Sequence, residues 1–468
     1  EAGAGGGPLQ HAPPGQPPAL RSVSLRHRSP PSAPPGSPFR VPGAGRRAAP
    51  GGGGAPGGDQ PGARTRAPVT LKLNYRTELY IPKRAEEFAQ QHPWITVELL
   101  TDTGYEKLVA QIAAGDPGDV IWLSTGVGTY FEMAALGNLL DVGPLVAADK
   151  YDLKQQIAVG VETAKIVDGK LFGLPSGLHP SHLGLFYNVS LFETAGVAPP
   201  TLNTTYDELA DIARKMTGGT GPDGRPARWG LQTETTPAAP LLCFVRSFGG
   251  ELLDPGFLGK RVAFDRPPAK QALQWLFDLR HRHRVHPLPG GDPVRFVDGN
   301  VAMQTTLMSG GFAYLRDVGN RFKMDATLIP KGPGGKRGSQ GHVDMWGMFS
   351  RTKHKDEAWL LHQWLANKET SQARFAETGS PGARVDGWND PAVVASPMFR
   401  VFKDFVEKEG VGLIALPWNL RMLEFSNQVI PKAFEPLWAG TVGVDQAVAA
   451  AAGPVQQLLD QPRPAAAR

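Results

Sequence analysis

The sequence has almost no cysteine, because Cys243 is the only one in 468 residues. A single cysteine excludes a disulfide framework within the chain and a metal site built from several thiolates. Cys243 lies in the apolar run LLCFV at residues 241–245. We therefore expect it to pack as a small hydrophobic core residue.

Long apolar runs are also missing. No stretch reaches the roughly 18 consecutive apolar residues that span a bilayer, and the alanine-rich run at residues 447–452 is far too short. Arg46 and Arg47 are followed by Ala-Ala-Pro and glycines instead of the apolar segment of an export signal. We expect no membrane-spanning helix and no export signal in the given sequence.

Residues 1–68 have few aromatic and acidic residues: Phe39 is the only one of the 39 aromatics, and Glu1 and Asp59 are the only acids. They contain 15 Pro, 15 Gly and eight Arg, and their net charge of +6, subtracted from the total of +5, leaves −1 for residues 69–468. This composition predicts a disordered Pro/Gly/Arg-rich tail. A linker, a twin-arginine signal or translated sequence upstream of the true start all stay open. Scattered arginines without interleaved aromatics do not favour nucleic-acid binding.

Motifs of catalysis and cofactor binding are absent or incomplete. The sequence contains neither H-E-x-x-H nor G-x-S-x-G. The glycine-rich turn at Gly126 and Gly128 has Phe131 in place of the third glycine of a dinucleotide site. His281 and His286 lie in a stretch where histidines alternate with arginines and no acid. We expect no cofactor and no metal, and we expect the glycine-rich turn to present backbone N–H groups to a polar ligand.

Hydrophobic periodicity predicts strands that alternate with helices, which is typical of βαβ units on a parallel sheet. The predicted strands lie at residues 69–75, 95–100, 119–123, 171–175, 183–187, 326–330 and 343–349. The predicted helices lie at residues 81–91, 105–114, 129–135, 191–195, 206–216, 241–248, 268–283, 356–367, 371–377, 397–409, 422–438 and 444–459. Ser190 with Glu193 and Thr205 with Glu208 fit capping boxes. Gly453-Pro454 predicts an interruption of the last helix.

A series of short stretches, taken in order over residues 69–460, resembles the family 1, sugar-binding type of extracellular solute-binding proteins of bacterial ABC importers. The stretches are FAQQHPWITV (88–97), IAAGDPGDV (112–120), LGNLLDVGPL (136–145), DGKLFGLP (168–175), LFYNVSLFETAGVAPP (185–200), YDEL (206–209), FGGEL (248–252), FVDGNVAM (296–303) and KDEAWLLHQWL (355–365). Each is weak alone, whereas their order and spacing together are specific.

The resemblance implies an α/β, two-lobed periplasmic-binding-protein fold of type II-like topology. Its three hinge crossings are expected near residues 176–183, 301–304 and 343–350. The implied N-terminal lobe comprises residues 69–178 and 304–346, and the implied C-terminal lobe comprises residues 182–300 and 350–462. Two-lobed binders of this kind close on a ligand by hinge motion.

The resemblance also implies a set of residues that line the cleft between the lobes. From the N-terminal lobe we expect the loop after the first strand, the turn at residues 103–105, and residues 124–126; from the crossings and the second lobe we expect further polar and aromatic residues. The full ligand-binding set is Asn74, Arg76, Tyr105, Ser124, Thr125, Gly126, His182, Phe248, Glu251, Gly310, Phe312, His342, Trp346, Trp418 and Arg421.

The function implied is that of a non-enzymatic, extracytoplasmic binding component that captures a carbohydrate-like solute and delivers it to membrane permease subunits as a monomer. An anionic or peptidic solute is one alternative, favoured by Arg76, Arg421 and His342. A carbohydrate-active enzyme is another, which requires two cleft carboxylates. Glu251 is the only acid in the predicted set, which argues against the enzyme.

Overall fold

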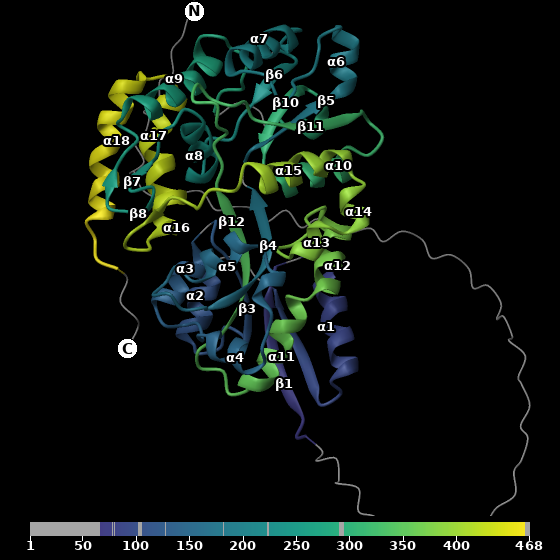
Figure 1. The fold of residues 1–468 in the computed structure, drawn as a ribbon. Coiled ribbons are helices and arrows are strands. Elements are labelled where there is room, and N and C mark those ends of the chain that lie inside the picture. The colour runs from purple at the N-terminus through teal and green to yellow at the C-terminus, as the bar shows by residue number, and fades with distance from the viewer. Residues whose placement is uncertain are drawn as a thin grey trace, which may run out of the picture. The chain divides into compact units, whose positions relative to one another are not determined.

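A computed structural model describes residues 66–463, apart from residues 77, 79, 102–104, 127, 181, 222–223 and 290–293 (Figure 1). Residues 1–65 of the predicted tail therefore lie outside the described residues. The described residues belong to one unit, residues 65–468. Two principal sheets organise it, and we call each sheet with its helices a lobe. The first lobe comprises residues 66–180 and 341–378, and the second comprises residues 184–328 and 397–463.

The first lobe is built on a five-stranded sheet of order β2-β1-β3-β12-β4. Its strands are β1 (Val69–Tyr75), β2 (Ile95–Thr101), β3 (Val120–Ser124), β4 (Gly173–Pro180) and β12 (Gly341–Met348). β1 runs parallel to β2 and β3, as the sequence predicts, whereas β12 runs antiparallel to β3 and β4. The helices of this lobe are α1 (Tyr80–Gln91), α2 (Tyr105–Ala113), α3 (Thr129–Ala135), α4 (Gly143–Ala148), α5 (Ala158–Ala164), α11 (Lys355–Leu365) and α12 (Lys368–Thr378).

The second lobe is built on a four-stranded sheet of order β11-β5-β10-β6. Its strands are β5 (Gly184–Asn188), β6 (Trp229–Gln232), β10 (Val301–Thr306) and β11 (Met324–Leu328). Helices α6 (Val189–Ala195) and α7 (Tyr206–Met216) enclose a core with Leu185, Leu231 and Met303. Helices α10 (Met308–Val318) and α15 (Pro397–Lys408) complete the lobe around Phe186 and Phe402, whose rings stack with centroids 5.9 Å apart.

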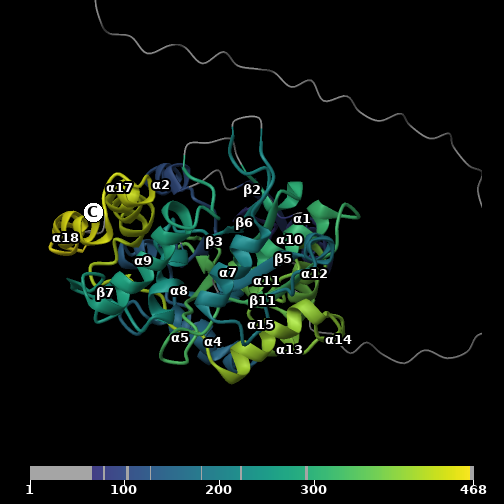
Figure 2. The ribbon, with the colours of Figure 1, turned by 90° about the horizontal axis from the view of Figure 1, so that it is seen from above.

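A helical layer extends the second lobe. It contains α8 (Ala238–Ser247), α9 (Pro267–His281), α16 (Met422–Glu424), a π-helical segment (Phe425–Val429), α17 (Ile430–Trp438) and α18 (Val444–Leu459). Seen from above, α17 and α18 lie at one side, away from α13 (Val385–Trp388) and α14 (Pro391–Val394) (Figure 2). Short strands β7 (Leu253–Asp254), β8 (Phe257–Gly259), β9 (Arg261–Val262) and β13 (Leu416–Pro417) pair within this layer.

Helix termini test the capping predictions. Thr205 and Glu208 form the predicted capping box at the start of α7. The predicted box at Ser190 is wrong, because Asn188 is the N-cap of α6 and accepts the backbone N–H of Leu191. The predicted break in α18 is also wrong, since the helix continues through Pro454.

The connections between the lobes differ from two of the three expected crossings. The first expectation, residues 176–183, holds in part, because residues 176–180 lie in β4 and the chain passes to β5 after residue 180. Residues 301–304 are not a crossing, since they lie inside β10 between β5 and β6. Residues 343–350 are not one either, because β12 lies in the first sheet and the chain continues into α11. The other two crossings are residues 329–340 and 379–396.

The lobe boundaries shift accordingly. Residues 304–328, expected in the N-terminal lobe, form β10, α10 and β11 of the second lobe. The segment 355–378, expected in the C-terminal lobe, forms α11 and α12, which pack on β12 and α1 of the first lobe. Hydrophobic periodicity predicts where a strand is but not which strand it pairs with, so these assignments required the structure.

The structure describes two features about which the composition makes a prediction, the burial of Cys243 and the length of the apolar helices. Cys243 is fully buried in α8, and burial raises the pKa of its thiol to about 12, so it is a core residue as predicted. Among the described residues, no helix combines the length and apolar character needed to cross a membrane.

A buried histidine attaches α11 to the first sheet. His362 has no exposed surface, and its Nε2 lies 2.6 Å from the backbone oxygen of Trp346 in β12. Burial lowers the pKa of His362 to about 4 although this hydrogen bond favours the charged form. The folded protein therefore keeps the ring neutral through pH values at which an unfolded histidine is protonated.

Acid should reduce stability through His362. Between the unfolded pKa near 6.5 and the folded pKa near 4, the unfolded chain binds more protons, so the free energy of unfolding falls as pH falls, by up to about 1.4 kcal/mol per pH unit. Urea unfolding near pH 7, 6 and 5 should give a shallower pH slope for His362→Gln than for wild type, by about 1 kcal/mol per unit. Identical slopes would contradict this account.

Candidate functional site

A cavity of about 610 Å³ lies between the two lobes. Its first-lobe lining comes from the ends of β3, β4 and β12, from α12 and from the loop after β1. Its second-lobe lining comes from α8, α10, α16 and the π-helical segment. The lining residues are Arg76, Glu78, Leu108, Trp122, Ser124, Gly126, Thr129, His179, His182, Pro237, Ala239, Leu307, Ser309, His342, Asp344, Arg374, Thr378, Leu423 and Asn427.

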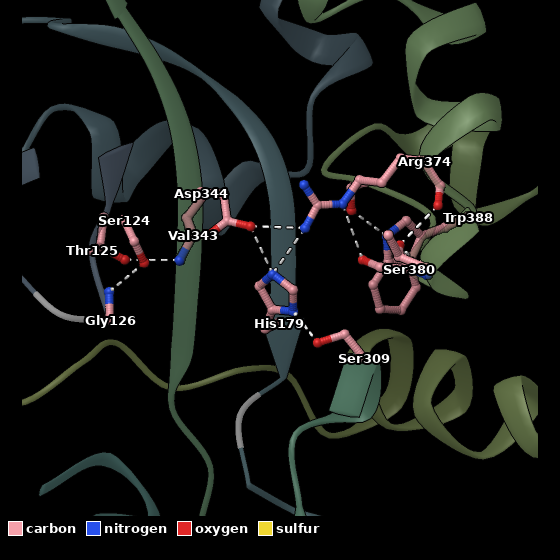
Figure 3. A network of polar contacts seen from close by, with 12 residues as sticks. Ser124, Thr125, Gly126, His179, Ser309, Val343, Asp344, Arg374, Ser380 and Trp388 are labelled. Atoms are coloured by element: carbon pink, nitrogen blue, oxygen red, sulfur yellow. Dashed lines mark hydrogen bonds and ion pairs between the residues drawn. The ribbon is translucent and has the colours of Figure 1, made fainter. Parts of the chain in front are cut away.

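A buried charge cluster of Arg374, Asp344 and His179 forms part of this lining (Figure 3). Nη2 of Arg374 donates to Oδ2 of Asp344 at 2.8 Å, and Nε2 of His179 lies 2.9 Å from the same oxygen. The three residues come from α12, β12 and β4, so three elements meet here. Nε of Arg374 is also 3.5 Å from the hydroxyl of Ser380.

The cluster is charged in the folded protein. Burial opposes ionisation of Asp344, but His179 and Arg374 outweigh it and hold the pKa of the carboxyl well below its usual range. Burial likewise opposes the charge on Arg374, while Tyr80 and Asp344 keep its pKa raised. Glu78 lines the same cavity, and burial raises its pKa despite nearby Arg374 and Arg76. The cavity thus contains one firmly ionised carboxylate and one that gains a proton more easily.

A second histidine lies against the first. The rings of His179 and His342 stack with centroids 4.4 Å apart. Burial, with His179 as the next cause, lowers the pKa of His342 well below its usual value, so this ring is neutral at neutral pH. The glycine-rich turn touches it, because a Cβ on Gly126 would lie 2.9 Å from the His342 ring.

Ligand atoms of His179, His342 and Asp344 lie within 4.8 Å of one another, which is close enough to consider a metal ion. However, Nη2 of Arg374 lies 2.8 Å from Asp344 and 3.2 Å from Nε2 of His179. A divalent cation here would face a fixed guanidinium at contact distance, so this donor set does not suit a metal.

Trp122 provides the aromatic part of the lining. It lies in β3, it is half-buried, and the guanidinium of Arg76 lies 4.8 Å from its ring centre. Among the described residues, nothing accepts a hydrogen bond from its indole Nε1, although this atom is buried. A flat ring with an unused donor beside charged groups suits a ligand that has both apolar faces and hydroxyls.

The lobes touch across the cavity at several points. Oγ of Ser309 in α10 lies 3.2 Å from Nδ1 of His179 (Figure 3). Gly128, with φ of 83°, approaches α16 so closely that a Cβ would lie 2.6 Å from Cβ of Met422. Nδ1 of His182, in the first crossing, lies 2.8 Å from Oε2 of Glu234.

Five predicted site residues line this cavity: Arg76, Ser124, Gly126, His182 and His342. The predicted turn at residues 103–105 cannot be placed there, since residues 103 and 104 and the side chain of Tyr105 lie outside the described part of the chain.

Three predicted residues belong to the interior of the first lobe instead. Asn74 donates to Oε1 of Gln111 and to the backbone oxygen of Pro117. The Thr125 hydroxyl accepts the Val343 N–H at 2.8 Å and ties β3 to β12. Trp346 is buried in β12 opposite Trp122 in β3.

The remaining predicted residues lie outside the cavity lining in the second lobe. Glu251 pairs with Arg246 at 2.8 Å, and Arg421 contacts Glu424 at 3.4 Å. The other four serve packing or backbone contacts: Phe248 packs on Tyr206, Gly310 faces Thr306, Phe312 packs on Phe399 and Phe402, and Trp418 donates to the Leu459 backbone oxygen.

Sequence reasoning missed the charge cluster and Trp122. One signal existed for Asp344, because a carboxylate inside the apolar run VDMW of a predicted strand is costly unless it is paired. The position of Trp122 within the predicted strand IWL carried no sign of which face it occupies. Nothing in the sequence distinguished Arg374 from a solvent-exposed helical arginine.

Comparison with known proteins identifies the family to which this chain is similar. The family model for bacterial extracellular solute-binding proteins matches residues 76–372. A Brucella abortus (strain 2308) relative, named as a binding protein, is 26% identical over 342 residues, which cover 70% of this chain and 79% of the relative.

Solved structures share the fold at low sequence identity. An ABC substrate-binding protein from Listeria monocytogenes in complex with cycloalternan has a TM-score of 0.73 and 20% identity, and the match covers 84% of this chain and 99% of that one. The maltodextrin-binding MalE of Bdellovibrio bacteriovorus, bound to maltotriose, has a TM-score of 0.68 and 17% identity, with 84% and 100% covered. UgpB of Mycobacterium tuberculosis, in complex with glycerophosphocholine, has a TM-score of 0.71 and 15% identity, with 83% and 98% covered.

The matched segment includes β3 as well as β4 and β12, which carry His179 and Asp344, and it ends within α12, two residues before Arg374. With an α/β fold of two lobes around a cavity and a family match over more than half its length, the chain belongs to the bacterial extracellular solute-binding proteins.

Proposed function

We propose that the protein captures a carbohydrate-like solute in the cavity between its lobes and presents it to the permease subunits of an ABC importer. It would act as a monomer in the periplasm or at the cell surface, without chemical change to the solute. The observation that carries the proposal is the cavity of about 610 Å³, in which Trp122 lies with charged groups of the first lobe and hydroxyl groups of both lobes.

The polar groups of the cavity suit neutral hydroxyls. Asp344 is held ionised and accepts hydrogen bonds, while the guanidinium of Arg374 donates them in a fixed plane. Because the two charges already neutralise each other, the pair favours a dipolar ligand over a free ion. Ser124 and Ser309 add hydroxyls from the first and second lobes respectively.

Closure of the lobes is the step that would retain the solute. Within the described part of the chain, the lobes are joined by three crossings, which contain residues 182–183, 329–340 and 379–396. Ser309, Leu423 and Asn427 come from the second lobe and the charge cluster comes from the first, so only a closed arrangement brings both sets to one ligand.

Two alternatives have specific support. Arg76 and Arg374 both line the cavity, which favours a solute with a phosphate group, such as the glycerophosphocholine in the UgpB complex. Glu78 and Asp344 give the cavity two carboxylates with pKa values shifted in opposite directions, which is the arrangement of a carbohydrate-active enzyme. Against catalysis, Asp344 is already engaged by Arg374 and His179.

A thermal-shift panel should separate these functions. Maltotriose, mannobiose, tagatose and glycerophosphocholine, the ligands of structurally similar proteins, are tested singly against the full chain. We expect at least one of the sugars to raise the melting temperature in a saturable way, because a ligand that binds only the folded state stabilises it. A response to glycerophosphocholine alone would replace the sugar by a phosphate-containing solute, and release of a product from any sugar would contradict a binding role.

The Trp122→Ala variant should weaken binding of the responding sugar by at least about tenfold, because it removes the aromatic face of the cavity. Trp94→Ala is the matched control. Trp94 is also half-buried, has a buried indole nitrogen without a partner among the described residues, and lies 4.6 Å from Arg66 in the same type of contact. Calorimetric titration should show unchanged affinity for the Trp94 variant, and equal losses in both variants would refute the assignment of Trp122.

A further inference from the structure

A second cavity, of about 720 Å³, lies wholly within the second lobe. Its described walls come from the end of β6, the loop at residues 233–236, α9, residues 286–289, Val294, the π-helical segment and α17. It adjoins the cavity between the lobes without sharing a lining residue, since Thr236 and Gln428 line one and their neighbours Pro237 and Asn427 line the other.

Arg280 is the buried charge of this cavity. It lies in the last turn of α9 and is only 4% exposed. Nη1 donates to the Leu276 backbone oxygen at 2.9 Å, and Nη2 has only contacts of 3.4 Å, to Thr233 and Thr235. Its guanidinium also lies 5.0 Å from the ring centre of Trp438. All these partners are neutral.

The other buried arginines have a carboxylate partner. The four others that are nine-tenths or more buried in the described chain each have one within 4.0 Å: Arg84 has Glu87, Arg337 has Glu409, Arg374 has Asp344 and Arg384 has Asp386. Arg280 has no described carboxylate within that distance. Burial lowers the pKa of Arg280 to about 9, which still leaves it charged at neutral pH.

Among the described residues that line the cavity, no other buried group balances this charge. His286 is held neutral because burial and then Arg280 lower its pKa to about 3. Glu435 and Lys432 both line the cavity, are exposed and carry opposite charges. A buried charge without a counter-ion is costly, so an anion that reached Arg280 would supply the counter-charge that the described residues do not.

We propose that the cavity around Arg280 binds a phosphate group, as free phosphate or as the phosphate of a small phosphomonoester, independently of the solute between the lobes. The planar fork of a guanidinium matches phosphate oxygens in a bidentate way. The hydroxyls of Thr235 and Thr236 line the same cavity and supply further donors. A cavity of about 720 Å³ has room for either form of the ligand.

The test is a thermal-shift and calorimetric titration of the full chain with inorganic phosphate and with glycerol 3-phosphate, at ionic strength held constant with sodium chloride. We expect a saturable rise in melting temperature, and binding at least about tenfold weaker in Arg280→Met. A response to both compounds assigns the site to phosphate groups in general, and a response to inorganic phosphate alone assigns it to the free ion. No response beyond that of sodium chloride would overturn the proposal.

Three variants test whether the response to phosphate comes from Arg280. Thr235→Asp places a carboxylate beside Nη2 of Arg280, and it should raise the melting temperature without phosphate and abolish the response to it. Arg384→Gln removes a buried arginine that has its own carboxylate and should leave the phosphate response intact. Arg76→Gln, in the cavity between the lobes, should also keep it. Loss of the response in Arg76→Gln but not in Arg280→Met would show that phosphate binds in the cavity between the lobes, and it would overturn the proposal.

Discussion

The ion pair between Arg374 and Asp344 is the constraint on which the arrangement of the first lobe depends. Both side chains are at least nine-tenths buried, so each must find its partner in the folded state. This requires β12 to lie between β3 and β4 and α12 to pack beside them. Removing one partner of such a pair typically costs about 3–5 kcal/mol, because the other charge is left unpaired. The same requirement fixes polar groups at the cavity between the lobes.

The buried arginines Arg374 and Arg280 therefore give their cavities a different charge balance. Arg374 is neutralised by its own chain, so its cavity presents a balanced set of donors and acceptors that suits a neutral, hydroxyl-rich solute. Arg280 has only neutral partners among the described residues, so its cavity presents a net positive charge that suits an anion. The contrast explains why two neighbouring cavities in one binding protein would take different ligands.

Much of the fold could be predicted from the sequence, because hydrophobic periodicity locates strands such as β1 and β3 and helices such as α7. Strand pairing could not be predicted this way, which is why β10 was expected as a crossing and β11 and α11 were expected in the other lobe. For the site, the family resemblance located Ser124 and His342, yet it selected Trp346 where its cross-strand neighbour Trp122 lines the cavity. Arg374 could be recognised only from its burial, which depends on α12 packing against α1 and on the ion pair with Asp344 of β12.

The central claim is that the solute is held by the Arg374–Asp344 pair and Trp122 between two closed lobes. A crystal structure of the full chain with the sugar that gives the largest thermal shift tests it most directly. The account predicts sugar hydroxyls within about 3.2 Å of Asp344 and Arg374 and a sugar ring against Trp122. A sugar bound elsewhere, with the cavity between the lobes left to solvent, would contradict it.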